Sequence, residues 1–152
     1  MLKYLFFLPI SIFLMQCEND ATEDCSATTC TANTFKLIIV DSTTGENLIE
    51  NGSYTDADIS IFDEKNMASL FYVNATESVP GIQLQVAITE SQEKSYTVSL
   101  KSDASFSTTM DVKKIGEGSE CCGVDTQINS ISVSGATSEI NLSNRSLTIF
   151  ID

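Results

Sequence analysis

The chain has 152 residues, 21 Asp and Glu against 8 Lys and Arg, a formal charge of −13, five cysteines, and neither His nor Trp. Without imidazole it cannot form a Ser-His-Asp or Cys-His nucleophilic site, a His-ligated metal site or a histidine proton shuttle. A nucleic-acid partner is also disfavoured, because neutralising phosphates requires clustered Lys and Arg. Such an excess of acidic residues is more typical of a highly soluble surface.

The first 16 residues have the pattern of a cleavable export signal. Lys3 precedes an uncharged run over 4–15, which suits the apolar region of about 7 to 15 residues in a signal peptide. The run is too short for a membrane-spanning helix, which needs roughly 20 apolar residues. We therefore expect a signal peptide over 1–16 and no spanning helix in the mature chain.

The sequence LMQC over 14–17 resembles the bacterial lipobox, in which a Leu three residues before a Cys marks cleavage and transfer of a diacylglyceryl group to the cysteine sulfur. Gln16 departs from the small residue that this pattern prefers. Glu18 and Asp20 resemble the surface-export signal of Bacteroidota lipoproteins. The resemblance implies lipidation of Cys17 and a surface-exposed domain anchored by lipid in the outer membrane of the cell envelope. Ordinary secretion without a lipid is the alternative.

The mature chain divides into a tether and one domain. Residues 17–34 are rich in Asp, Glu, Thr, Ala and Ser, and a flexible stretch of this length reaches about 20 to 25 Å. From Phe35 onward the sequence consists of short runs with a two-residue period, separated by turn residues. We expect a single domain over 35–152.

Alternation of apolar and polar residues predicts an all-β fold, an antiparallel β-sandwich of about eight strands. Strands 35–40 and 67–73 are apolar on both faces, which suits central positions, whereas 96–100 and 106–112 have a polar face and suit the outside. No apolar stripe at helical spacing extends over three turns, which argues against a βαβ topology. The expected strands are 35–40, 58–62, 68–73, 82–88, 96–100, 106–112, 131–134 and 147–151.

The stretch over 35–62 resembles the opening strands of transthyretin-like and carboxypeptidase-regulatory-like modules, in which a strand ends in Asp, a Thr-Gly turn follows and a second strand carries alternating apolar residues. The resemblance implies a seven- or eight-stranded sandwich that serves as a structural or binding appendage without catalytic residues. The matching residues are Asp41, Thr44, Gly45, Leu48, Ala57, Ile59 and Ile61.

Four cysteines follow Cys17, namely Cys25, Cys30, Cys121 and Cys122. Exported chains keep such residues oxidised, and a bond between two adjacent cysteines is strained, so we expect two bridges from the first pair to the second. Each would close a loop of roughly 90 residues, and the first would stabilise the fold by about 4 to 5 kcal/mol in the loop-entropy model. A four-cysteine zinc site and free redox thiols are the alternatives.

The remaining candidates are carboxylates and tyrosines. The acidic stretch over 56–66 is a candidate calcium site, because calcium binds carboxylate oxygens. Isoleucines occupy alternate positions within it, as in a strand, which favours carboxylates that are solvated at the ends of turns. Because the chain has no Trp, only exposed tyrosines are candidates for stacking on a sugar. The sequence predicts a non-catalytic binding or structural module with an envelope protein or glycan as partner and no cofactor or metal; a secreted carboxylate-dependent enzyme or inhibitor is the alternative. The candidates are Asp56, Asp58, Asp63, Glu64, Tyr54, Tyr72 and Tyr96.

Overall fold

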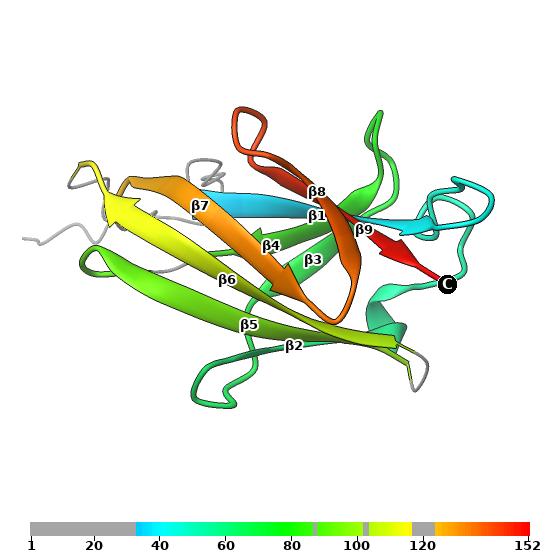
Figure 1. Cartoon of the computed structure of the whole chain (residues 1–152), viewed down its shortest axis with the longest axis horizontal. Coiled ribbons are helices and arrows are strands. Elements are labelled where there is room, and N and C mark those ends of the chain that lie inside the picture. The colour runs from blue at the N-terminus through cyan, green and yellow to red at the C-terminus, as the bar shows by residue number, and fades with distance from the viewer. Residues whose placement is uncertain (1–32, 87, 102–103, 117–123) are drawn as a thin grey trace, which may run out of the picture.

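The computed structural model describes residues 33–86, 88–101, 104–116 and 124–152, which form two β-sheets packed as a sandwich (Figure 1). The predicted all-β fold class is confirmed. Within these residues there are nine strands, and a short 3₁₀ turn, η3 (Asp56–Asp58), precedes the second. The strands are β1 (Thr34–Asp41), β2 (Ile59–Asp63), β3 (Phe71–Asn74), β4 (Gly81–Gln85), β5 (Gln92–Leu100), β6 (Ala104–Lys114), β7 (Thr126–Ser134), β8 (Thr137–Asn141) and β9 (Ser146–Ile151).

The first and last strands lie side by side in the middle of the larger sheet. Its order is β3-β4-β1-β9-β8, and the smaller sheet has the order β2-β5-β6-β7. All neighbouring strands run antiparallel except β1 and β9, which are parallel with Ile38 opposite Thr148. Both strands therefore run in one direction, from the end of the sandwich where Asn33 lies to the end where Asp152 lies (Figure 1).

The core lies between the sheets and is built from the alternating residues that the sequence pattern predicts. In β1, Phe35, Leu37 and Ile39 are fully buried, while the residues between them face outward. The partner sheet contributes Val98 and Leu100 from β5. Because the layer between the sheets excludes water, each such side chain contributes roughly 1.5 to 3 kcal/mol to folding.

Three predicted strand positions are wrong. The apolar run over 67–73 predicts a central strand, but β3 is an edge strand, and Leu70 and Tyr72 are 73% and 51% exposed. The run is a loop followed by a short strand, so its second apolar face has no neighbouring layer. Conversely, β5 and β6 occupy the middle of the smaller sheet. Their polar face is exposed because, among the described residues, nothing packs on the outside of that sheet.

β8 lies outside the predicted strands. Ile140 is its only apolar residue, and that side chain is 44% exposed at the edge of the larger sheet. The strand is held by pairing with β9, in which Leu147 lies opposite Ile140. Among the described residues there is no helix long and apolar enough to cross a membrane.

Candidate functional site

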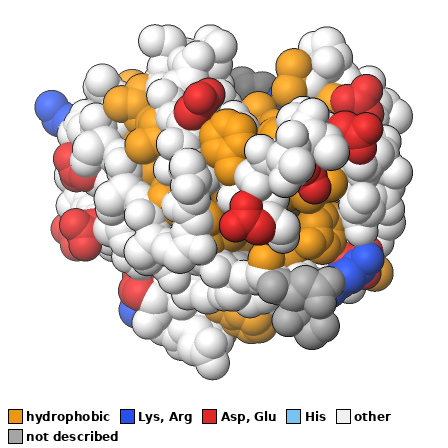
Figure 2. Space-filling model, turned by 45° about the vertical axis from the view of Figure 1, so that its right-hand side comes forward, with side chains coloured by type: hydrophobic (Ala, Val, Ile, Leu, Met, Phe, Trp, Pro, Cys, Tyr) orange, Lys and Arg blue, Asp and Glu red, His pale blue; other side chains and the backbone are white. Residues whose placement is uncertain are grey.

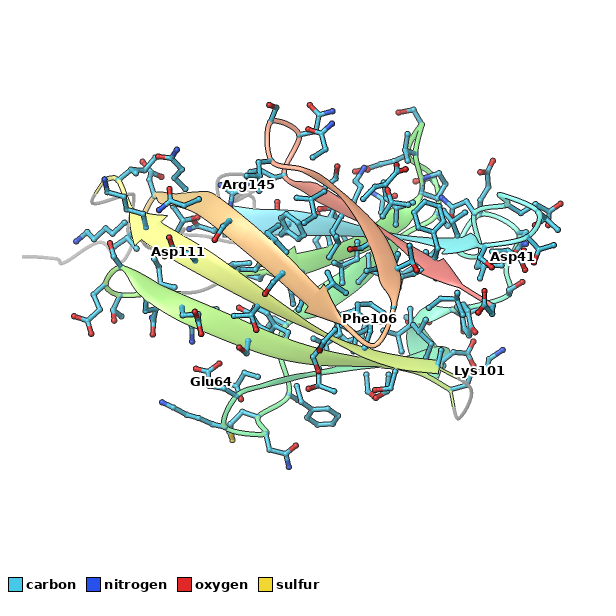
Figure 3. The ribbon with its side chains drawn as sticks, in the orientation of Figure 1. Asp41, Glu64, Lys101, Phe106, Asp111 and Arg145 are labelled. Carbon is cyan, nitrogen blue, oxygen red and sulfur yellow. The ribbon has the colours of Figure 1, made fainter. Side chains whose placement is uncertain are left out.

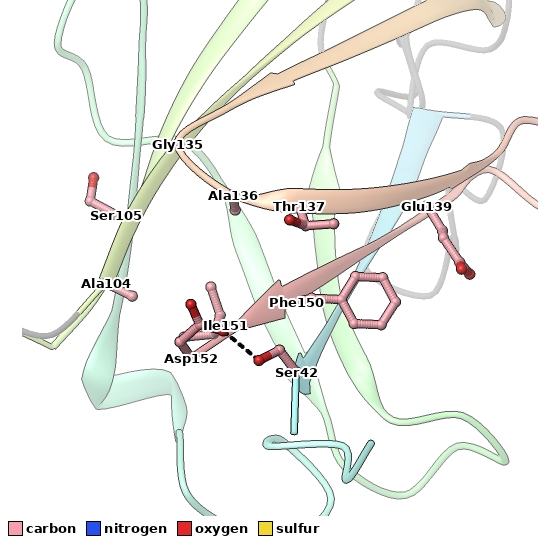
Figure 4. Close-up of a pocket in the computed structure, with 10 residues that line it drawn as sticks. All are labelled: Ser42, Ala104, Ser105, Gly135, Ala136, Thr137, Glu139, Phe150, Ile151 and Asp152. Atoms are coloured by element: carbon pink, nitrogen blue, oxygen red, sulfur yellow. Dashed lines mark hydrogen bonds between the residues drawn. The ribbon is translucent and has the colours of Figure 1, made fainter. Parts of the chain in front are cut away.

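A wide hollow lies at the end of the sandwich where β1 and β9 finish. We call this open hollow of about 820 Å³ the distal cleft; it is lined by Ser42, 104–105, 135–137, Glu139 and 150–152 (Figure 4). Figure 2 shows this end of the molecule, where apolar side chains lie in a hollow among acidic ones. The site thus combines residues from both sheets and from both ends of the domain sequence.

The turn that joins β7 to β8 forms one wall of the distal cleft and carries the chain from one sheet to the other. Gly135 lies in this turn with a φ of +89°, a conformation that L side chains disfavour. A Cβ at this position would also lie 3.2 Å from the carbonyl oxygen of Ser105. Glycine therefore allows the turn to pass close to the start of β6.

The C-terminus is tied to the loop that follows β1. The Ser42 hydroxyl donates a hydrogen bond to the Asp152 carboxylate, and the Ser42 backbone N–H donates to the Ile151 carbonyl oxygen over 2.8 Å. These contacts hold the floor of the distal cleft (Figure 4). They also leave the second carboxylate oxygen of Asp152 as an acceptor for a ligand.

Phe150 is the aromatic side chain of the distal cleft. It lies on β9 out of phase with the buried Leu147 and Ile149, and therefore on the outer face of the sheet. Its cross-strand neighbours on that face are Val40 and Thr137. The ring is half-buried, so one part of its surface is available to a ligand. The sequence pattern places Phe150 in a strand but does not single it out as a site residue. An aromatic residue on the otherwise polar face of that strand could have indicated a binding surface.

Two carboxylates line the distal cleft and point in different directions. Glu139 and Asp152 are the two acidic residues that line it. In Figure 4 Asp152 lies just past the end of β9, whereas Glu139 lies on β8 and points away from Asp152. The cleft lining contains hydroxyls and an aromatic ring but, among the described residues, no Lys or Arg. Its chemistry is that of hydrogen-bond acceptors and donors around an apolar surface.

The carboxylates singled out in the sequence have local structural roles. Asp58 accepts hydrogen bonds from the Thr55 N–H and hydroxyl at 2.9 and 2.8 Å, and the first of these is the main cause of a lowered Asp58 pKa. Asp63 accepts the backbone N–H groups of Lys65 and Met67 in the turn after β2. Carboxylates commonly accept such hydrogen bonds from the backbone in turns and at helix caps.

Glu64 and Asp56 complete this set. The Glu64 pKa is lowered, chiefly by a hydrogen bond from its own backbone N–H and then by Lys94, whose Nζ lies 3.4 Å from the carboxylate. Asp56 accepts the N–H of Ala57. Within the described ranges, no group of three or more His, Cys, Asp or Glu side chains is arranged to hold a metal ion.

Two of the three candidate tyrosines are not available for ligand stacking. Tyr54 and Tyr96 are 9% and 4% exposed and belong to the core. Burial, followed by the nearby Glu64 and Asp63 charges, raises the pKa of Tyr96 to about 12. Tyr72 is exposed on β3, away from the residues that line the distal cleft.

The cysteine predictions fall outside the described residues. Cys17, Cys25, Cys30, Cys121 and Cys122 all lie in 1–32 or 117–123, so lipidation and the two bridges stay predictions. Comparisons with protein-family models, with curated proteins and with solved structures found no match. Function must therefore be inferred from the chemistry of this chain.

Proposed function

We propose that this protein is an exported lipoprotein of the cell envelope whose β-sandwich binds a glycan in the distal cleft without catalysing a reaction. The observation that carries the proposal is the position of the cleft. Asn33, where the described domain begins, and Asp152, in the cleft, lie at opposite ends of β1 and β9 (Figure 1). The eight residues of β1 span about 26 Å. A domain tethered at Asn33 would therefore present the cleft away from the membrane.

The lining of the distal cleft supports a polyhydroxyl ligand. Ser42, Ser105 and Thr137 can donate to or accept from sugar hydroxyls, and the two carboxylates can accept from them. The half-exposed ring of Phe150 offers the apolar surface on which a pyranose ring stacks. The acidic charge at this end disfavours an anionic ligand, so we propose a neutral or amine-bearing glycan.

The membrane part of the proposal rests on the sequence. The lipobox resemblance over 14–17, the acidic residues after Cys17 and the polar tether over 17–34 support a lipid anchor in the outer membrane with the domain at the cell surface. The resemblance to transthyretin-like and carboxypeptidase-regulatory-like modules supports a binding appendage. Its characteristic turn has a local basis here, because the Asp41 carboxylate accepts the N–H groups of Thr43 and Thr44 at 2.9 and 2.7 Å.

Glycan binding is tested by titrating the purified mature protein against an array of neutral and amine-bearing oligosaccharides. We expect Phe150→Ala to weaken binding at least tenfold. Phe62→Ala is the matched control, because Phe62 is also a half-buried aromatic on an outer sheet face but lies on β2. Equal binding by Phe150→Ala and the parent, or no binding by the parent, would overturn the proposal. New reducing ends in the mixture would instead support the enzyme alternative.

The anchor is tested separately by mass spectrometry of the mature N-terminus in envelope fractions. The expected species begins at Cys17 and carries diacylglyceryl and acyl mass on that residue. Cys17→Ser is the control and should accumulate as the unprocessed chain. A mature chain that begins elsewhere with an unmodified residue would contradict the lipid anchor and leave the glycan proposal to be judged on its own.

A further inference from the structure

A second hollow lies at the opposite end of the sandwich from the distal cleft. This groove of about 430 Å³ is lined by the first four residues of β7 (126–129), Ile115, Leu142, Ser143 and Arg145, and we call it the Arg145 groove. Figure 3 shows Arg145 beside the start of β7, far from Asp41 and Lys101 at the other end. The two hollows share no lining residue among those described, so each can be altered without touching the other.

Three hydrogen bonds position the Arg145 guanidinium in this groove. Nε donates to the Thr34 carbonyl oxygen at 2.9 Å, Nη1 to the Thr126 carbonyl oxygen at 2.8 Å, and Nη2 to the Thr126 hydroxyl at 3.1 Å. A guanidinium has five N–H donors. One N–H on each of Nη1 and Nη2 therefore has no acceptor among the described residues. The side chain is positioned in advance for an additional oxygen ligand.

The charge of Arg145 is not neutralised within the described part of the chain. The three ion pairs found there use Lys36, Lys94 and Lys101, and Arg145 forms none. The described lining of the groove contains no Asp or Glu, although the whole chain has 21 acidic residues. A half-buried guanidinium without a carboxylate partner favours an anion, and its planar fork suits a carboxylate in particular.

The walls of the groove favour an anion attached to an apolar group. Ile115 and Leu142 both line the hollow and are 59% and 39% exposed. Exposed aliphatic side chains beside a fixed charge are typical of binding sites in which a polar group sets the orientation and apolar contacts add affinity. Free inorganic anions would leave both side chains in water.

The third wall is the edge strand β7. Within the described residues β7 pairs only with β6 and is the longest of the four edge strands. Its sequence, TQINSISVS, contains no charged residue and no Pro, which are the features that usually protect an edge from pairing. Ile131 and Val133 are only partly buried against the core. Such an edge can accept an extended peptide as an additional strand.

We propose that the Arg145 groove binds the C-terminal carboxylate of an extended peptide that adds to the edge of β7. The carboxylate lies against Arg145 at the first residue of β7, so the preceding peptide residues run toward Ser134 and the added strand is antiparallel to β7. Backbone hydrogen bonds and apolar contacts with Ile115 and Leu142 provide affinity, and the guanidinium selects a free C-terminus. The partner is a protein with an accessible, apolar C-terminal segment.

The test is fluorescence anisotropy with the full mature protein and labelled hexapeptides of the form Thr-Val-Thr-Val-Thr-X, where X is each of the twenty residues. Every peptide is used with a free C-terminus and as its C-terminal amide. We expect apolar X to bind best and the free acid to bind at least tenfold tighter than the amide. Equal affinity of acid and amide, or no binding by any acid peptide, would overturn the proposal.

Two substitutions separate the groove from the fold. Leu142→Asp places a carboxylate at the wall and should weaken binding of the acid peptide at least tenfold, with an unchanged melting temperature. Leu70→Asp is the matched control, because Leu70 is 73% exposed and does not line the groove. It should leave binding unchanged. Unchanged binding in Leu142→Asp would overturn the site, as would sodium acetate binding in the absence of any peptide binding. Phe150→Ala should not affect this assay, which distinguishes its failure from that of the glycan proposal.

Discussion

The guanidinium of Arg145 and the backbone carbonyl of Thr126 are joined by a hydrogen bond of 2.8 Å that connects the turn after β8 to the first residue of β7. Because Arg145 also donates to the Thr34 carbonyl in β1, one side chain ties the larger sheet to the smaller one. Burial lowers the pKa of the Arg145 guanidinium, but arginine remains charged at neutral pH. The contact is a fixed cationic bridge between the two layers.

Removing this bridge should destabilise the domain. Arg145→Ala leaves the Thr34 and Thr126 carbonyls without these two donors. We expect a loss of about 3 to 6 kcal/mol, since each hydrogen bond to a charged group contributes roughly 1.5 to 3 kcal/mol. Arg145→Gly is the informative companion. The residue has a φ of +49°, so Gly relieves backbone strain and should be about 1 kcal/mol more stable than Ala. Urea unfolding measures the stability of both variants. Equal stability would contradict backbone strain at position 145.

Thr108→Val should stabilise the protein. Thr108 is fully buried on β6, and its hydroxyl has no hydrogen-bond partner among the described residues. Valine has nearly the same shape and no polar atom to desolvate, so we expect a gain of about 1 to 2 kcal/mol in unfolding free energy. Thr97→Val on the exposed face of β5 is the control and should change stability little. If Thr108→Val destabilises the protein, the Thr108 hydroxyl has a hydrogen-bond partner in the folded state.

Gly135→Ala should destabilise the turn beside the distal cleft more than Gly52→Ala destabilises its loop. Both glycines have positive φ, but a Cβ at 52 meets nothing within 4 Å, whereas one at 135 meets the Ser105 carbonyl oxygen at 3.2 Å. Strain alone costs roughly 1 to 3 kcal/mol at each site. The close contact adds to it only at 135. Thermal unfolding of both variants provides the comparison, and a smaller effect at 135 would show that the turn relaxes freely.

Alkaline pH should destabilise the protein through Tyr96. Its pKa is raised from 10.0 to about 12 in the folded state, so the unfolded state releases the proton first. Stability from this group is complete below pH 10 and is lost as pH rises from 10 to 12, by about 2 to 3 kcal/mol in total. Tyr96→Phe should flatten that decline. The measurement is unfolding free energy against pH, and an equal slope in both proteins would exclude Tyr96 as its cause.

Deleting 147–152 should prevent stable folding. Leu147 and Ile149 are fully buried on β9, which pairs with β1 on one side and β8 on the other. Burial of two such side chains contributes about 3 to 6 kcal/mol, and the deletion leaves unpaired backbone on both neighbouring strands. Deleting 18–24 is the control, because Ala21 is the only aliphatic residue there. A C-terminal deletion that melts within a few degrees of the parent would contradict the central position of β9.

The two-residue period of the sequence is sufficient to predict the fold class and most of the core. Ile59 and Ile61, or Val98 and Leu100, alternate with polar residues and are buried as that pattern predicts. The burial follows from the strand itself, because successive side chains point to opposite faces. The same rule does not detect β8, since an exposed edge strand needs no apolar alternation.

Strand pairing and the contacts between distant side chains are set by the packing of the two sheets and not by local sequence. The parallel pairing of β1 with β9 depends on residues more than 100 positions apart, and local periodicity contains no information about such a partner. The distal cleft combines Ser42, Gly135 and Phe150 for the same reason. Arg145 contacts Thr34 and Thr126 because two sheets that fold over one core bring their ends together, a consequence of packing that no single segment of the sequence expresses.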